Sequence, residues 1–232
     1  MALVPLNLPA GVYRNGTDLQ SQGRWRDSNL VRWFDDTLRP IGGWRTRSDT
    51  ASAGQVRGMH SWIANNSDRW IAAGSYNKLY VYSGAGIQYD ITPTGFTAGN
   101  EDALTPVGYG NSFYGLEYYG TPRQESVTIT PATTWSMDSW GQYLVACSST
   151  DGKVYEWQLS TGTIAAVVAN APVNNRAILV TEERFLMCLG AGGNPRLVQW
   201  SDREDNTVWT PAATNEAGSL ELQTTGRIQC GV

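Results

Sequence analysis

Histidine and cysteine, the residues most often found in metal sites and nucleophilic centres, are almost absent from this sequence. Its 232 residues include one histidine, His60, and three cysteines, Cys147, Cys188 and Cys230. No two cysteines have CxxC spacing, and a single histidine cannot build a histidine-based metal site. We therefore expect no metal, no cofactor and no disulfide, and we interpret His60 as a packed or rim residue of a strand.

Charge is also scarce, and it is unevenly placed. Charged residues make up 16% of the sequence, and the net charge is −4. Residues 1–57 hold eight arginines and five aspartates, a local charge of +3, which leaves −7 for the remainder. A low charge density is typical of a β-rich protein with a Ser-, Thr- and Asn-rich surface, or of a subunit that buries much of its surface against neighbours. The local excess of arginine indicates an N-terminal segment that meets a partner.

Long apolar runs and the common catalytic motifs are missing as well. No apolar run reaches the roughly 18 residues of a membrane span, and the N-terminus lacks a signal-peptide pattern, so we expect no membrane insertion. There is no GxSxG motif, and the glycines at 190–193 are not followed by the helix that a phosphate-binding loop requires. The acidic pairs lie in predicted turns. We expect no enzymatic activity, although a carboxylate pair assembled in space stays open at this stage.

The strongest positive signal is a repeat of short aromatic strands. QYLVA at 142–146 aligns with RFLMC at 184–188, which places Tyr143 and Phe185 42 residues apart. Each is followed by a glycine-containing turn and a strand that ends in tryptophan, Trp157 in one copy and Trp200 in the other. A weaker copy lies at 69–82. A period near 42 built from short strands is the size of one four-stranded propeller blade.

We therefore predict an all-β, β-propeller-like fold of four-stranded antiparallel blades, complete or incomplete in this chain. Residues 1–55 are expected to form an arm and a hairpin, and residues 56–232 the blades. A Gly/Tyr-rich insertion at 93–126, where Tyr-Gly recurs at 109, 114 and 119, interrupts them. The expected blade-packing residues are Trp70, Trp157, Trp200 and Trp209, with Trp157 and Trp200 in equivalent environments.

The last residues, GRIQCGV at 226–232, resemble the first strand of a further blade. Two interpretations are open. Either the N-terminal hairpin closes the ring, or the chain is the front part of a longer protein. We favour the second.

The N-terminal region predicts an extended arm followed by a hairpin. Pro5 and Pro9 prevent a regular helix in the arm, and the strands at 29–34 and 38–41 flank a turn at 35–37. Arginine suits an interface because its planar guanidinium binds carboxylates and stacks on aromatic rings. The expected interface residues are Arg24, Trp25, Arg32, Trp33, Arg39 and Trp44. The alternative is that Trp33 and Trp44 fill the core of the hairpin itself.

Two groups of motifs carry a resemblance to a known family. The first comprises GRW at 23–25, NLVRW at 29–33 and LRPIGGW at 38–44. The second comprises WSD at 200–202, WTP at 209–211 and AGSLEL at 217–222. Together they resemble the tail nozzle, or packaged-DNA-stabilisation, proteins of tailed bacteriophages.

The resemblance implies a structural subunit of a virion tail. Such a subunit forms a homo-oligomeric ring, usually of six copies, below the portal and adaptor. It contacts tail fibre or needle proteins and lets double-stranded DNA pass without sequence-specific binding. It would be found in the virion tail, and in the host cytoplasm during assembly. The alternatives are a propeller-type carbohydrate- or receptor-binding module at the tail tip and a glycan-degrading hydrolase. An assembly of about six copies would favour the nozzle.

Overall fold

The computed structural model describes residues 9–43, 45–103 and 130–231. It divides the chain into two compact units, Met1–Thr46 and Arg47–Val232, which we call the N-terminal unit and the sheet unit. Within the described ranges the regular structure is β, apart from one 3-10 turn, η1 (Ala191–Gly193), and no α-helix occurs. The prediction of an all-β fold is confirmed. No helix in this part of the chain could span a membrane.

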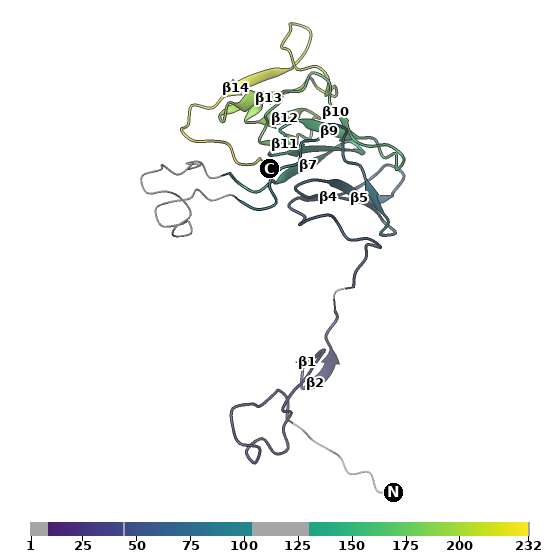
Figure 1. Ribbon diagram of the computed structural model, residues 1–232, viewed down its shortest axis with the longest axis vertical. Coiled ribbons are helices and arrows are strands. Elements are labelled where there is room, and N and C mark those ends of the chain that lie inside the picture. The colour runs from purple at the N-terminus through teal and green to yellow at the C-terminus, as the bar shows by residue number, and fades with distance from the viewer. Residues whose placement is uncertain (1–8, 44, 104–129, 232) are drawn as a thin grey trace, which may run out of the picture. The chain divides into compact units, whose positions relative to one another are not determined.

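The sheet unit contains three four-stranded antiparallel sheets that follow one another in the chain (Figure 1). The first sheet is β3 (Met59–Ile63), β4 (Arg69–Gly74), β5 (Leu79–Ser83) and β6 (Gln88–Asp90). The second is β7 (Trp135–Trp140), β8 (Tyr143–Ser148), β9 (Val154–Trp157) and β10 (Ala166–Val167). The third is β11 (Ala177–Val180), β12 (Leu186–Leu189), β13 (Leu197–Trp200) and β14 (Gly218–Glu221). In each sheet the strands lie in sequence order, as in propeller blades, and the sheets of the described ranges do not form a closed ring.

The sheets pack face to face through two hydrophobic cores. The first core lies between the first and second sheets and includes Trp62, Trp70, Leu79, Trp135 and Trp157. The second core lies between the second and third sheets and includes Trp140, Cys147, Ile178, Cys188 and Trp209. Because alternate residues of a strand point to opposite faces, β8 supplies Leu144 and Ala146 to one core and Val145 and Cys147 to the other. The second sheet is therefore covered on both faces.

The chain leaves each sheet in the same way. Backbone N–H groups of the departing segment donate to the turn between the second and third strands, from Gly99 to Tyr76 (2.8 Å) and from Asn175 to Gly152 (2.9 Å). The third sheet repeats this with Ile228 and Pro195 (2.9 Å). The sequence repeat therefore covers each sheet together with the connecting segment that leaves it.

Trp157 and Trp200 do not share an environment, so that prediction was wrong. Trp157 is 1% exposed in the first core. Trp200 is half-buried on the face of the third sheet that points away from the second sheet, and its Nε1 donates to the Glu216 carbonyl (2.8 Å).

The reason lies in the register of the third strand of each sheet. On the face that points toward the preceding sheet, Ala146 pairs with Tyr155 in the second sheet, and Cys188 pairs with Gln199 in the third. The turn between β12 and β13, which contains η1, is longer than the turn between β8 and β9. When the two sheets are aligned by these strand pairs, Trp200 stands one position before the place that corresponds to Trp157. A one-position difference turns a strand side chain to the opposite face.

The segment before the first strand also differs from the prediction. Residues 47–55, expected in the N-terminal arm, lie on the first sheet, where the Asp49 N–H donates to the Gly86 carbonyl (3.3 Å) and the Ala53 N–H to the Tyr80 hydroxyl (3.2 Å). The fourth strand of the second sheet, β10, is only two residues long. Of the predicted insertion, only residues 93–103 are described, and the three Tyr-Gly pairs lie outside the described residues.

Candidate functional site

The N-terminal unit is built around one β-hairpin. Strands β1 (Val31–Phe34) and β2 (Thr37–Pro40) pair in antiparallel register, from Val31 with Pro40 to Phe34 with Thr37. The connecting residues Asp35 and Asp36 have φ angles of 46° and 55°. Two left-handed residues between two strands give the turn whose twist matches a hairpin, and aspartate tolerates this conformation better than most residues.

One face of the hairpin combines like charges with an exposed ring. Arg32 and Arg39 stand directly opposite each other, and the guanidinium of Arg39 lies 4.8 Å from the centre of the Phe34 ring. We call Arg32, Phe34 and Arg39 the arginine face. Like charges paired across two strands are destabilising, and an isolated two-stranded hairpin is marginal in water. This face is therefore better suited to contact with a partner than to stabilising the hairpin.

The opposite face packs within the N-terminal unit. The rings of Trp33 and Trp25 lie 5.8 Å apart, and the Trp25 carbonyl accepts a hydrogen bond from the Tyr13 N–H (2.9 Å). The guanidinium of Arg24 lies 5.5 Å from the Tyr13 ring centre. Trp33 thus contributes to the unit's own small core, as the alternative interpretation expected. Trp44 lies outside the described residues.

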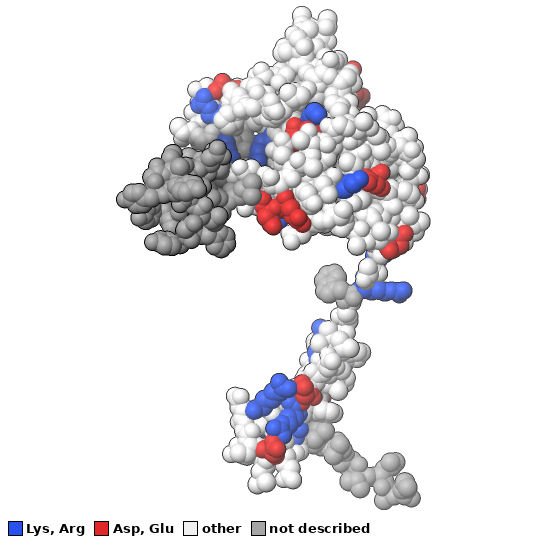
Figure 2. All heavy atoms as spheres, in the orientation of Figure 1, with Lys and Arg blue, Asp and Glu red and all other residues white. Residues whose placement is uncertain are grey.

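The charges of the N-terminal unit are only partly compensated. It contains six arginines and four aspartates. Arg14 pairs with Asp27 (3.0 Å), and Arg26 pairs with Asp18. Arg24, Arg32 and Arg39 form no ion pair within the described ranges, and Figure 2 shows the arginines of this unit gathered beside its aspartates. The unit therefore offers uncompensated positive charge next to exposed apolar surface.

Three of the four predicted packing tryptophans lie in the two cores. Trp70 and Trp157 lie in the first core, and Trp209 lies in the second, where its Nε1 donates to the Asn206 carbonyl (2.7 Å). Trp200 belongs to neither core. The tryptophans that sequence reasoning missed are Trp62, Trp135 and Trp140. Each is an aromatic residue of a short strand, in β3 or at the ends of β7, and the strand preference of aromatic residues is the signal that could have indicated them.

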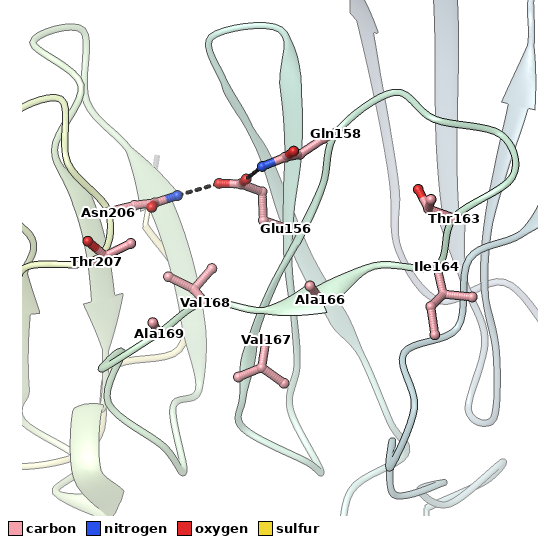
Figure 3. Close-up of a pocket in the computed structure, with 10 residues that line it drawn as sticks. All are labelled: Glu156, Gln158, Thr163, Ile164, Ala166, Val167, Val168, Ala169, Asn206 and Thr207. Atoms are coloured by element: carbon pink, nitrogen blue, oxygen red, sulfur yellow. Dashed lines mark hydrogen bonds between the residues drawn. The ribbon is translucent and has the colours of Figure 1, made fainter.

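A pocket with a volume of about 450 Å³ lies at the outer edges of the second and third sheets (Figure 3). Glu156 of β9 projects into it, accepting hydrogen bonds from Asn206 and from Gln158 Nε2, the latter at 2.7 Å. The lining residues are Glu156, Gln158, Thr163, Ile164, Ala166, Val167, Val168, Ala169, Asn206 and Thr207.

This pocket has limited chemical capacity. Glu156 is its one carboxylate, and both of its oxygens already accept from neutral amides. A glycosidase pair needs a second carboxyl group, which this lining does not contain. The lining also has no aromatic ring on which a sugar could stack. Among the described residues, no group of three or more His, Cys, Asp or Glu side chains could hold a metal ion.

His60 lies in the seam between the first and second sheets. Its Nε2 is 2.8 Å from Ser139 Oγ on β7, and its ring stacks on Trp62 with centroids 5.9 Å apart. Burial lowers the pKa of His60, and the nearby Asp138 carboxylate partly opposes that shift. The histidine therefore joins two sheets, which accords with the packed position we expected.

No protein-family model, curated protein or solved structure matches this chain. Functional assignment therefore depends on its residues and geometry.

Proposed function

We propose that this protein is a non-enzymatic structural subunit of a multi-chain assembly, and that its N-terminal unit docks it into that assembly. The observation that carries the proposal is the arginine face. Arg32 and Arg39 oppose each other beside the exposed Phe34, with no carboxylate partner among the described residues. An acidic, partly apolar surface on a neighbour would relieve the repulsion and cover the ring.

The surface of the sheet unit is consistent with this role. Figure 2 shows large areas without charged side chains on the face in view. The tryptophans that could have stacked on sugars are mostly packed between sheets, which weakens the alternative of a carbohydrate-binding module. A weakly charged subunit with an uncompensated basic hairpin is better suited to contacts with other proteins.

The assembly that we propose is the tail of a tailed bacteriophage, as the sequence resemblance implies. In that setting the chain forms part of a homo-oligomeric ring that continues the DNA channel below the portal and adaptor. Tail fibre or needle proteins would contact the ring on its other side. An acidic sheet unit would repel the phosphate backbone and let the DNA pass.

The proposal is tested by reversing the charge of the arginine face in the full-length chain. Arg32→Glu with Arg39→Glu should leave the far-ultraviolet circular dichroism and the melting temperature of the sheet unit unchanged. The number of copies incorporated into purified particles, counted by quantitative mass spectrometry, should fall at least tenfold. Electron cryomicroscopy of the same particles should show tails that stop below the portal.

Arg203→Glu is the matched control, because Arg203 is an exposed arginine of the sheet unit. It should be incorporated normally. A deletion of residues 1–22 should reproduce the assembly defect. Particles that carry the double variant in normal numbers and retain their DNA would refute the docking role.

A further inference from the structure

The third sheet has one face, which we call the far face, that no other described sheet covers. Its residues alternate with those that pack on the second sheet, and all of them are apolar: Ala177, Leu179, Met187, Leu189, Val198, Trp200, Gly218 and Leu220. Leu220 is 58% exposed. Near the C-terminal segment this face is already buried: Gly231 lies against Leu179 and Leu189, and Ala177 and Leu189 are 4% and 6% exposed. A sheet face with this composition requires an apolar cover.

The first of the three sheets has a partly exposed apolar face that could provide such a cover. Its outward face, opposite the first core, presents Met59 and Ile63, which are 67% and 62% exposed. The segment at 47–57 covers this face near Tyr80 and leaves the β3 residues open.

The outward face also repeats the composition of a known sheet-packing face. Across β3, β4 and β5 it has the paired row Met59–Ala73–Tyr80. In the second sheet the same residue types form the row Met137–Ala146–Tyr155, and that row packs against the first sheet. Along this row the outward face of the first sheet is therefore built like a face that receives a preceding sheet, and the same face also carries Arg69, opposite Ile63, and Asp90, opposite Tyr80.

We propose that the far face of the third sheet docks the outward face of the first sheet of a second copy of this chain. The junction would be of the same kind as the two sheet-to-sheet junctions already present within the chain. The three described sheets of one copy and the three of a second give six, a number within the four to eight blades of a propeller. A contact between two different faces, repeated twice about a twofold axis, closes that ring.

This inference does not depend on the proposed function, because it uses no residue of the N-terminal unit. Loss of the junction in solution would leave the docking proposal untouched. If the Arg32→Glu, Arg39→Glu variant assembled normally, that result would likewise not contradict the proposed junction between sheets.

The test is the self-association of the full-length protein, measured by sedimentation velocity and light scattering over a range of concentrations. The wild-type chain should form a two-copy species. Leu220→Asp on the far face and Met59→Asp on the outward face should each weaken self-association at least about tenfold, because a charge would be buried against an apolar face. Both substituted residues are exposed in the single chain, so the melting temperature of the monomer should not fall.

Val173→Asp is the control, since Val173 is 52% exposed but lies on neither face. It should self-associate like the wild type. A mixture of Leu220→Asp and Met59→Asp chains should associate more strongly than either variant alone, because one of the two junctions in the mixed pair is unaltered.

Three results would overturn the proposal. The first is a wild-type chain that stays monomeric at every concentration. The second is a two-copy species disrupted by Leu220→Asp but not by Met59→Asp, which would mean that two far faces pair with each other. The third is a Val173→Asp chain that dissociates as readily as the two face variants.

Discussion

The ring of Trp157 in the second sheet meets the ring of Trp70 in the first at a centroid distance of 5.2 Å and an interplanar angle of 72°. Trp62 adds a second edge-to-face contact with Trp157 at 6.4 Å. Aromatic pairs in this geometry stabilise a core beyond the area that they bury. Trp157 thus contacts two tryptophans of the first sheet and contributes directly to the packing of the first two sheets.

Truncating this side chain should therefore be costly. We expect Trp157→Ala to lower the free energy of unfolding by about 3–5 kcal/mol, as measured by urea denaturation. Trp200→Ala should cost less than half as much, because that ring is half-buried on the far face. Equal losses for the two variants would contradict the difference in burial that the structure shows.

The three cysteines should differ in reactivity. Burial raises the pKa of the Cys147 thiol to about 12 and that of Cys188 well above its usual value, whereas Cys230 is exposed. The thiolate is the reactive form, so iodoacetamide at pH 8 should label only Cys230 in the folded protein. Mass spectrometry after unfolding without a reductant should find all three labelled. Rapid native labelling of Cys188 would show that the second core is open.

The sequence predicted the sheets because their signal is local. Short apolar strands at a 42-residue offset gave the all-β class and the sequential strand order, which depend on alternation and turns. The faces of Trp157 and Trp200 could not be predicted, because they depend on the length of the turn that contains η1. The hairpin was visible for the same local reason as the sheets. The pairing of Arg32 with Arg39 could not be predicted, because it depends on the register of the hairpin. The pocket at Glu156 could not be predicted, because it forms where two sheets meet.

A glycine at one crossing between sheets should be irreplaceable. Gly152 has a φ of 65°, and its carbonyl accepts the backbone N–H and the side-chain Nδ2 of Asn175, each at 2.9 Å. A Cβ at this position would lie 2.5 Å from Asn174 Cα. Gly152→Ala therefore combines left-handed strain with displacement of the crossing.

Gly141→Ala separates these two effects. Gly141 has a similar φ of 61°, but the nearest atom to its added Cβ is the end of the Arg184 side chain at 3.4 Å. We expect Gly141→Ala to cost about 1–2 kcal/mol of stability, the strain alone, and Gly152→Ala clearly more. Thermal denaturation of the two variants side by side measures the difference. Equal losses of stability for the two variants would mean that the Asn174 backbone shifts to accommodate the added Cβ without a measurable cost.

His60 should make the seam between the first two sheets sensitive to mild acid. Burial lowers its pKa in the folded state below the unfolded value of 6.5, so the unfolded chain binds more protons in the window below pH 6.5. Stability is therefore fully present above that window and falls as the pH drops toward the folded-state pKa. His60→Gln keeps a side chain that can hydrogen-bond Ser139 but cannot titrate. The melting temperature of the wild type should fall more than that of His60→Gln between pH 7.5 and pH 5.5, and parallel curves would show that His60 is protonated as easily in the folded chain as in the unfolded one.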